Sequence, residues 1–332
     1  MSSEDQGNET SPDYRMSYRD VAIHKVMLQD VVRTDAYEKS IRQLVRSEHR
    51  VLDFGCGTGV LAIFAARAGA RQVIAVDRSA FVQTAREIAQ RNGFDTIEFY
   101  HDDHQSLKLP EKVDVIVSEW MGHCLFYEAM LEPLLTVRDR HLAKGGTMIP
   151  AQVSLHAGLV CDEDLLEDLS FFGERPYGID FSPISHVPFQ QTDLVALGPE
   201  SIMKNTAHLG SLDMHSVCKS ETPRVFSGKV IPERKARISA LCGWFSAELS
   251  PGVKLGTGPN DLPTHWDQVL FPLPRPFSVA PSRELTITIS PLTEKVGKEQ
   301  LWHWSITDGE NTVSVNEQQQ HRALADLPPG KL

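Results

Sequence analysis

The chain has 332 residues, of which 41% are hydrophobic, 23% charged and 8% aromatic. This length favours two domains, and the composition is that of ordinary globular proteins, which excludes a mostly disordered chain, a collagen-like repeat and a coiled-coil rod. The formal net charge of −11 disfavours a nucleic-acid-binding protein, whose affinity depends on contacts to phosphates, and favours a cationic substrate.

Cysteine usage and hydropathy exclude further classes. The five cysteines are widely spaced and include no CxxC pair, so we expect neither a disulfide framework nor a structural metal site. No stretch approaches the roughly 18 apolar residues that a membrane helix requires. Residues 1–13 are polar, unlike a signal peptide, and are predicted to be disordered. We therefore expect a soluble protein of a reducing compartment, the cytoplasm or, in a eukaryotic cell, also the nucleus.

Helical periodicity begins at Tyr14 and continues to Leu44. Thr34 and Asp35 are expected to cap a second helix that ends near Ser47. Strands and helices then alternate between residues 49 and 150. The predicted strands are 50–54, 72–76, 96–100, 113–117 and 147–149, and the predicted helices are 61–68, 79–92 and 129–141. This alternation is typical of a parallel sheet that is covered by helices on both faces.

The pattern changes after Pro150. Residues 153–160 alternate like a strand, residues 163–172 predict a helix, and an irregular Pro-rich segment follows to about residue 199. Strand-like runs then dominate, at 225–230, 236–249, 277–280, 284–289 and 301–306. These runs predict an antiparallel β domain, in which Trp302 and Trp304 share one face of a strand and are assigned to the core.

The first chemical signal is the glycine-rich loop GCGTG, from Gly55 to Gly59, between a strand and a helix. Such a loop lets a ligand approach the backbone closely. The dinucleotide fingerprint requires glycine or alanine where this chain has Val60. Asp53, and Asp77 at 18 residues after Gly59, instead suit S-adenosylmethionine (SAM), because Asp77 can accept hydrogen bonds from a ribose diol. A simple turn without a ligand is the alternative.

The second signal is an apolar loop that is bracketed by Glu119 and Glu128. Glu119 follows a predicted strand, where ligands of open α/β sheets bind. Two carboxylates in one apolar pocket would repel each other, but a guanidinium, which presents five donors and stays charged, would satisfy both. Their grip would concentrate positive charge on one side of the guanidinium, so that the remaining terminal nitrogen gains nucleophilicity toward a sulfonium methyl group. Ordinary solvated carboxylates are the alternative.

Several motifs together resemble the protein arginine methyltransferases, from about Tyr14 to about Ile306. Residues 118–131, SEWMGHCLFYEAML, are similar to the double-glutamate loop of that family, and residues 51–59, VLDFGCGTG, to its cofactor motif. Thr264-His265-Trp266 matches its THW loop. Residues 14–18 resemble its YFxxY motif, and residues 27–34 the segment that closes over the cofactor.

The resemblance implies a role for each matching residue. Glu119 and Glu128 would clamp the substrate guanidinium, and His265 would pair with Asp30 near the leaving proton. Substrate contacts would come from Tyr18, Met130, His123 and Trp266. The cofactor, SAM with S-adenosylhomocysteine (AdoHcy) as its product, would be bound by Tyr14, Met27, Arg33, Asp53, Gly55, Gly57, Gly59, Asp77, Arg78, His104, Gln105 and Glu119.

The implied fold is α/β: a SAM-binding Rossmann-like parallel sheet followed by an antiparallel β-barrel domain with a helical dimerisation arm. The expected ranges are 1–13 disordered, 14–48 helices over the cofactor, 49–150 the SAM domain and 151–332 the barrel domain, with the arm at about 163–199. A homodimer without nucleic-acid or membrane partners is expected.

The implied activity is methyl transfer to a guanidino nitrogen of arginine in a protein, giving monomethylarginine, while an asymmetric dimethyl product stays open. Free L-arginine or an arginine-containing small molecule is the alternative substrate. A non-catalytic scaffold is the third reading, because the chain departs from the family at Asp77 (usually Glu), Gln105 (usually an acid), His123 (usually Tyr) and Arg15 (usually aromatic).

Overall fold

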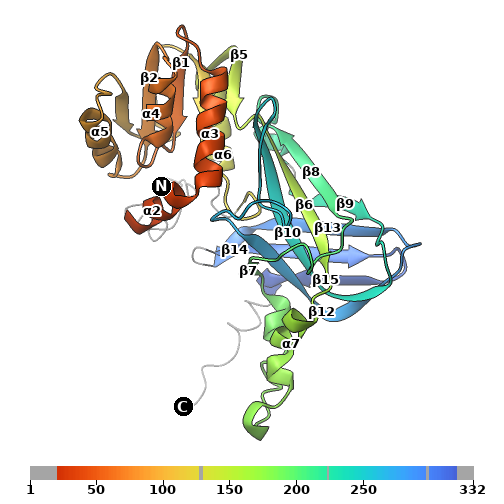
Figure 1. The fold of residues 1–332 in the computed structure, drawn as a ribbon. Helices are drawn as coiled ribbons and strands as arrows, with labels where there is room; N and C mark the ends of the chain where they lie inside the picture. Colours follow the sequence, from red (N-terminus) through yellow and green to blue (C-terminus); the bar gives the residue numbers. More distant parts are fainter. Residues whose placement is uncertain (1–20, 127–129, 223, 297–298, 320–332) are drawn as a thin grey trace, which may run out of the picture.

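The computed structural model describes residues 21–126, 130–222, 224–296 and 299–319 (Figure 1). A five-stranded parallel sheet has the order β3-β2-β1-β4-β5. Its strands are β1 (Arg50–Phe54), β2 (Gln72–Asp77), β3 (Glu98–His101), β4 (Val113–Val117) and β5 (Leu142–Ile149). All five residues of β1 are buried, as expected for a central strand that carries helices on both faces.

In the described residues, the helices that accompany the parallel sheet are α2 (Val21–Gln29), α3 (Val31–Leu44), α4 (Val60–Arg67), α5 (Val82–Arg91) and α6 (Leu131–His141). No helix within the described ranges is long and apolar enough to cross a membrane.

One prediction for the N-terminal helices was wrong. The chain breaks at Asp30, whose side chain accepts a hydrogen bond from the Arg33 N–H, so Asp30 caps α3 and Thr34 and Asp35 lie inside that helix.

The order of the parallel strands places two loops side by side. The chain leaves β1 toward β2 on one side and returns to β4 on the other, so the strand order reverses between β1 and β4. Ligands of open α/β sheets bind at such a switch point, outside the carboxyl ends of the strands. The loop after β1 contains Gly55–Gly59, and the loop after β4 begins at Ser118, whose hydroxyl donates to the Phe54 carbonyl at 2.7 Å.

Two antiparallel sheets form the rest of the chain. One comprises β6 (Gln152–Val160), β7 (Asp193–Val195), β8 (Ala207–Asp213), β10 (Ala236–Ser250), β11 (Val253–Gly256) and β12 (Gln268–Val279). The other comprises β9 (Phe226–Val230), β13 (Leu285–Val296), β14 (Glu299–Thr307) and β15 (Thr312–Asn316). Trp302 and Trp304 are buried in the shared core, where each ring lies 5.6 Å from that of Phe271, so their assignment to the core is confirmed.

An arm projects from the barrel between β6 and β7 (Figure 1). The arm comprises α7 (Glu163–Ser170) and the short 3-10 helices η1 (Phe171–Gly173), η2 (Pro176–Gly178) and η3 (Val187–Gln190). A fourth 3-10 helix, η4 (Lys219–Glu221), lies outside the arm and follows β8. Asp162 caps α7 by accepting from the Leu165 N–H at 3.1 Å. Tyr177 is 97% exposed and Ile179 54% exposed, so the arm carries apolar surface that the protomer does not cover.

The fold class is as expected, and the strands that the sequence reading missed have a common cause. β8, β11 and β15 alternate between buried and exposed residues but are only 7, 4 and 5 residues long, and the first half of β12 is uniformly buried and contains Pro272, so each offers too few alternating apolar positions to identify a strand. These segments become strands because they pair with neighbouring strands whose sequence pattern is clearer, as β12 pairs with β10.

Candidate functional site

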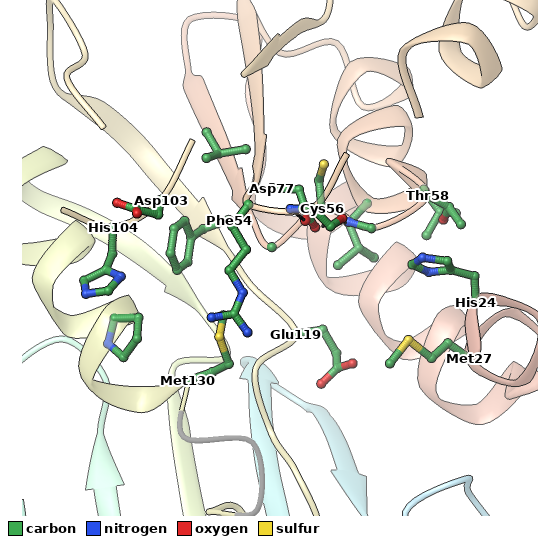
Figure 2. Close-up of a pocket in the computed structure, with 18 of the residues that line it drawn as sticks. His24, Met27, Phe54, Cys56, Thr58, Asp77, Asp103, His104, Glu119 and Met130 are labelled. Carbon is green, nitrogen blue, oxygen red and sulfur yellow. Dashed lines mark hydrogen bonds between the residues drawn. The ribbon is translucent and has the colours of Figure 1, made fainter. Parts of the chain in front are cut away.

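A cavity of about 230 Å³ lies at the switch point of the parallel sheet (Figure 2). Predicted site residues that line it are Met27, Arg33, Gly55, Gly57, Asp77, Arg78, His104, Glu119 and Met130. Predicted residues that are described but lie outside the lining are Asp30, Asp53, Gly59, Gln105, His123, His265 and Trp266. Tyr14, Tyr18 and Glu128 fall outside the described residues.

The glycine loop forms the floor of the cavity. The N–H groups of Gly55 and Cys56 both donate to the Val76 carbonyl, at 2.8 and 3.0 Å, which ties the loop to the end of β2. Gly57 has a φ of +51°, and a Cβ there would lie 3.2 Å from the His24 ring. Glycine is therefore required at position 57 both by the backbone conformation and by the closeness of α2.

His24 is a lining residue that the sequence reading missed, because a single histidine on a helix is usually structural or solvated. Its ring is buried, lies 4.0 Å from the ring of Phe81, and lines the cavity. The available signal was spacing: His24, Met27 and Leu28 lie three and four residues apart, so they share one face of α2, and all three line the cavity.

Asp77 ends β2 and joins two segments of the cavity wall. Its Oδ2 accepts from the Gly57 N–H at 2.9 Å, and its Oδ1 accepts from the Ser79 N–H at 2.7 Å. Each carboxylate oxygen has a second lone pair, so both oxygens remain able to accept hydrogen bonds from a ribose diol. Asp77 therefore both positions the glycine loop and offers acceptors to the cavity.

Replacing Asp77 by alanine is expected to weaken AdoHcy binding by at least about 1.5–3 kcal/mol, the usual contribution of a hydrogen bond to a charged group. The loss includes the tether to Gly57, so loop order should fall as well. Titration calorimetry measures the effect, and Asp77→Glu tests whether the longer acid serves equally. Unchanged affinity in the alanine variant would contradict the assignment of Asp77 to the ribose.

Asp53 lies under the glycine loop and is almost completely buried. Its Oδ2 accepts from the Ala62 N–H of α4 at 2.9 Å, while within the described structure its buried Oδ1 has no hydrogen-bond partner. Burial raises the pKa of Asp53 from 3.8 to about 7, against the lowering effect of the Ala62 hydrogen bond, and the charge of Asp77 adds to the increase. The apoprotein thus holds an acid whose charge is poorly compensated.

We expect Asp53→Asn to stabilise the apoprotein increasingly as pH rises. The unfolded chain ionises Asp53 near pH 3.8 and the folded protein only near pH 7, so the free energy of unfolding of the wild type falls across this interval. At about 1.4 kcal/mol per pKa unit, the advantage of the variant should grow by up to about 4 kcal/mol. Urea unfolding at about pH 4 and about pH 8 measures it, and an equal difference at both values would refute the interpretation.

Glu119 already accepts a guanidinium in the structure. Nε and Nη2 of Arg33 both donate to its Oε2, at 3.2 and 3.1 Å, and the two side chains are only 6% and 8% exposed. Nη1 of Arg33 donates to the Met27 carbonyl at 3.1 Å, which fixes the guanidinium between α2 and the loop after β4. Glu119 is thus a buried acceptor with one neutralising partner, as buried charges require.

Asp30 and His265 join the helices over the cavity to the barrel. Nδ1 and the main-chain N–H of His265 lie 2.8 and 2.9 Å from Oδ2 of Asp30. Burial alone would raise the pKa of Asp30, but the hydrogen bonds from His265 and the Arg33 N–H outweigh it and lower that pKa. Asp30 is therefore ionised at neutral pH and can accept a hydrogen bond from a ring N–H at Nδ1 of His265.

Trp266 and His123 are hydrogen-bonded to each other at the loop after β4 (residues 118–126) and do not line the cavity. The Trp266 indole N–H donates to the Met121 carbonyl at 2.6 Å, and Nδ1 of His123 is hydrogen-bonded to the Trp266 carbonyl. Cys124 and Leu125 adopt positive φ values of 46° and 71°, which is unfavourable for such residues. Because both side chains are buried, packing holds this strained turn in place.

The structure places the candidate residue Gln105 outside the cavity lining. Gln105 is exposed, and its N–H donates to Asp103 Oδ1 at 2.7 Å. The Asp103 carboxylate also accepts from the Ser106 N–H, and this turn leaves His104 rather than Gln105 in the lining. The sequence motifs placed both His104 and Gln105 at the cofactor, and they do not determine which of two adjacent side chains the turn directs into the cavity.

The lining fits a cofactor such as SAM. The glycines leave room for a ligand against the main chain, and the acceptors of Glu119 and Asp77 suit a molecule with a cationic end and a ribose diol. Within the described residues no group of three His, Cys, Asp or Glu side chains is arranged to hold a metal ion.

Comparison with known proteins assigns a family. Residues 151–301 match the model of the arginine methyltransferase oligomerization subdomain, and residues 51–146 match a methyltransferase domain. A relative from Dictyostelium discoideum, protein arginine N-methyltransferase 1, is 37% identical over 271 residues, which cover 79% of each chain.

Two solved structures share the fold over most of the chain. The Trypanosoma brucei PRMT1 enzyme–prozyme heterotetramer with AdoHcy has a TM-score of 0.81 and 30% identity, covering 90% of this chain and 100% of that chain. Arabidopsis thaliana protein arginine methyltransferase 10 has a TM-score of 0.78 and 25% identity, covering 92% and 100%.

Proposed function

The chain belongs to the family of protein arginine methyltransferases, and from this premise we propose that it methylates a terminal guanidino nitrogen of arginine residues in proteins, with SAM as the methyl donor. The observation that carries the proposal is the contact between Arg33 and Glu119, in which two guanidinium nitrogens donate to one buried carboxylate oxygen. It supports the assignment of Glu119 to a substrate guanidinium, because the carboxylate already meets one at hydrogen-bond distance.

The chemistry follows from the charges. Bound SAM supplies an electrophilic methyl group on a sulfonium. Glu119, with Glu128 as its proposed partner, holds the substrate guanidinium so that positive charge concentrates near the carboxylates and one terminal nitrogen becomes nucleophilic. Holding that nitrogen in line with the methyl group lowers the barrier by several kcal/mol.

The proton lost from the guanidinium needs an acceptor, and His265 supplies one in this proposal. Its Nδ1 donates to ionised Asp30, which leaves Nε2 with a free lone pair and stabilises the imidazolium that forms. His265 does not line the cavity of the apoprotein. In this proposal a water molecule or the bound substrate therefore carries the proton from the guanidinium to His265.

Two methionines favour an asymmetric dimethyl product after the monomethyl product. Met27 and Met130 line the cavity from α2 and from the residue before α6, and Figure 2 shows Glu119 between them. By resemblance, Met27 and Met130 match the methionines that border the substrate nitrogen in the family members that form asymmetric dimethylarginine, which supports the same product here.

We further propose that the protein acts as a homodimer in the cytoplasm. Phe171, Tyr177, Ile179 and Ile184 of the arm are exposed in the protomer, and Val21, Val26 and Val31 on the helices over the cavity are 68%, 50% and 61% exposed. Exposed apolar surface of this extent marks an interaction site. A two-fold arrangement in which each arm covers the partner's α2 and α3 would bury both surfaces at once.

The test offers the purified protein and isotopically labelled SAM three acceptors: an Arg-Gly-rich peptide, the same peptide with lysine in place of arginine, and free L-arginine. We expect label in the arginine peptide alone. Label in free arginine but not in the peptide would assign the protein to small-molecule methylation. AdoHcy binding without transfer to any guanidine would indicate a non-catalytic scaffold.

A further inference from the structure

Two histidines lie side by side on the barrel, away from the cavity. His156 of β6 and His208 of β8 are register partners on antiparallel strands, and their ring centres are 5.4 Å apart. Leu155 and Ala207, the residues before them, are fully buried, whereas His208 is exposed and His156 half-buried. Both imidazoles therefore project from the solvent-facing side of this sheet, and neither lines the cavity.

The separation of the two rings is close to that of two imidazoles on one metal ion. A Zn–N bond of about 2.1 Å places the ion about 3.2 Å from the centre of an imidazole ring. Two imidazoles at corners of a tetrahedron then have ring centres about 5.2 Å apart, compared with 5.4 Å between His156 and His208. Imidazole nitrogen is a preferred ligand of zinc and of related transition metals. The pair therefore has the spacing of half a tetrahedral site.

A serine orients each imidazole through its other nitrogen. Nε2 of His156 lies 2.9 Å from the Ser246 hydroxyl, and Nε2 of His208 lies 2.8 Å from the Ser211 hydroxyl. In the part of the chain that the structure describes, no hydrogen bond engages Nδ1 of either ring. A hydroxyl that accepts from Nε2 leaves the lone pair of the ring on Nδ1. Histidine ligands of metals are typically held by such a partner on the second nitrogen.

The surroundings of His156 also favour metal binding. Its ring stacks on that of Trp244 of β10, with the ring centres 6.0 Å apart and 18° between the planes, which fixes the orientation of the imidazole. Burial lowers the pKa of His156 and the charge of His208 lowers it further, whereas Asp261 opposes both effects. A metal ion binds only the neutral imidazole, and the negative charge of Asp261 attracts a cation.

We propose that Nδ1 of His156 and Nδ1 of His208 together bind one divalent transition-metal ion, with water completing its coordination. The site takes an ion such as Zn²⁺, which accepts nitrogen ligands, and not Mg²⁺, which requires oxygen ligands. The ion joins β6 to β8 and stabilises the folded chain, because the unfolded chain does not hold the two rings together. The inference is independent of the proposed methyl transfer, since neither histidine belongs to the cavity.

The test titrates Zn²⁺ alone, and Mg²⁺ alone for comparison, into the full chain. Every form of the protein carries Cys218→Ser, because an exposed thiol is itself a zinc ligand. Calorimetry at about pH 7.5 should show one Zn²⁺ ion bound per chain and no binding of Mg²⁺. Below about pH 6 the Zn²⁺ affinity should fall, because both imidazoles become protonated.

The ligand variants are His156→Gln and His208→Gln, each of which removes one nitrogen ligand. Each should weaken Zn²⁺ binding by at least about 10-fold, since even the loss of a group behind a ligand has that effect. His208 is exposed, so His208→Gln should unfold at the same temperature as its parent without metal. Zn²⁺ should raise the unfolding temperature of the parent but not of either variant.

The matched control is His303→Gln on β14. Nε2 of His303 lies 2.8 Å from the Ser314 hydroxyl, as in the proposed site, but the register partners of His303 are Ser290 and Asn316. This variant should bind Zn²⁺ as its parent does. Zn²⁺ affinity that is unchanged in His156→Gln or in His208→Gln would overturn the proposal, because the site requires both rings.

Discussion

Glu119→Gln should reduce methyl transfer by about 10²–10³-fold, the usual cost of losing one charged contact that stabilises a transition state. Glutamine keeps the size of the side chain, and its oxygen can still accept from Arg33. What it removes is the negative charge that organises the substrate guanidinium. The loss should therefore appear in kcat, with AdoHcy binding retained.

The matched control is Glu132→Gln, at an exposed glutamate in the first turn of α6 that does not line the cavity. It removes the same charge from the same part of the chain and should leave turnover unchanged. Glu128→Gln is expected to resemble Glu119→Gln. Near-normal turnover of Glu119→Gln on a confirmed guanidine substrate would show that the clamp lies elsewhere.

Placing aspartate at both Tyr177 and Ile179 should convert the protein to a monomer with weakened AdoHcy binding and little activity. Both side chains are largely exposed in the protomer, so the change leaves the fold of each subunit intact. Truncating a buried interface tyrosine typically costs about 2–4 kcal/mol, and a buried charge adds to that cost. Without the partner's arm, α2 and α3 lose the surface that steadies Met27 and Arg33 over the cavity.

Sedimentation at micromolar concentration measures the assembly, and calorimetry measures the cofactor affinity. Val225→Asp is the control, because it introduces the same charge at a residue 59% exposed on the barrel, and it should remain dimeric and active. A wild-type protein that sediments as a fully active monomer would contradict both the dimer and its link to catalysis.

The parallel part of the fold is largely predictable from the sequence. Strands β1 and β4 were predicted with the bounds that the structure has, because five mostly apolar residues in each end at a glycine or a polar residue. The break at Asp30 was missed because a polar residue within a helical pattern is usually a surface position. The resemblance had already implied that Asp30 pairs with His265, whereas its role as the cap of α3 follows only from the hydrogen bond that it accepts from the Arg33 N–H.

The sequence predicts those parts of the candidate site in which a motif determines the backbone conformation. It does not predict which side chain of a turn faces the cavity. The Gly55–Gly59 loop and Glu119 meet at one cavity because adjacent parallel strands end at the same edge of the sheet. His24 lines the cavity because α2 packs on Gly57, a tertiary contact that no local pattern reveals. Trp266 and His123 lie outside the cavity lining and are hydrogen-bonded to Met121 and to each other, an arrangement that depends on a tertiary contact with the loop after β4.

The most direct test of the account follows the methyl group itself. Wild-type protein, SAM and an Arg-Gly-rich peptide are incubated, and the peptide is fragmented by mass spectrometry while AdoHcy is quantified in the same sample. We expect methyl groups on guanidino nitrogens of arginine, in equal amount to the AdoHcy formed, and about 10²–10³-fold less of both products from Glu119→Gln. Methylation at any other atom, or AdoHcy formed without methylarginine, would contradict the assignment of this cavity to arginine methylation.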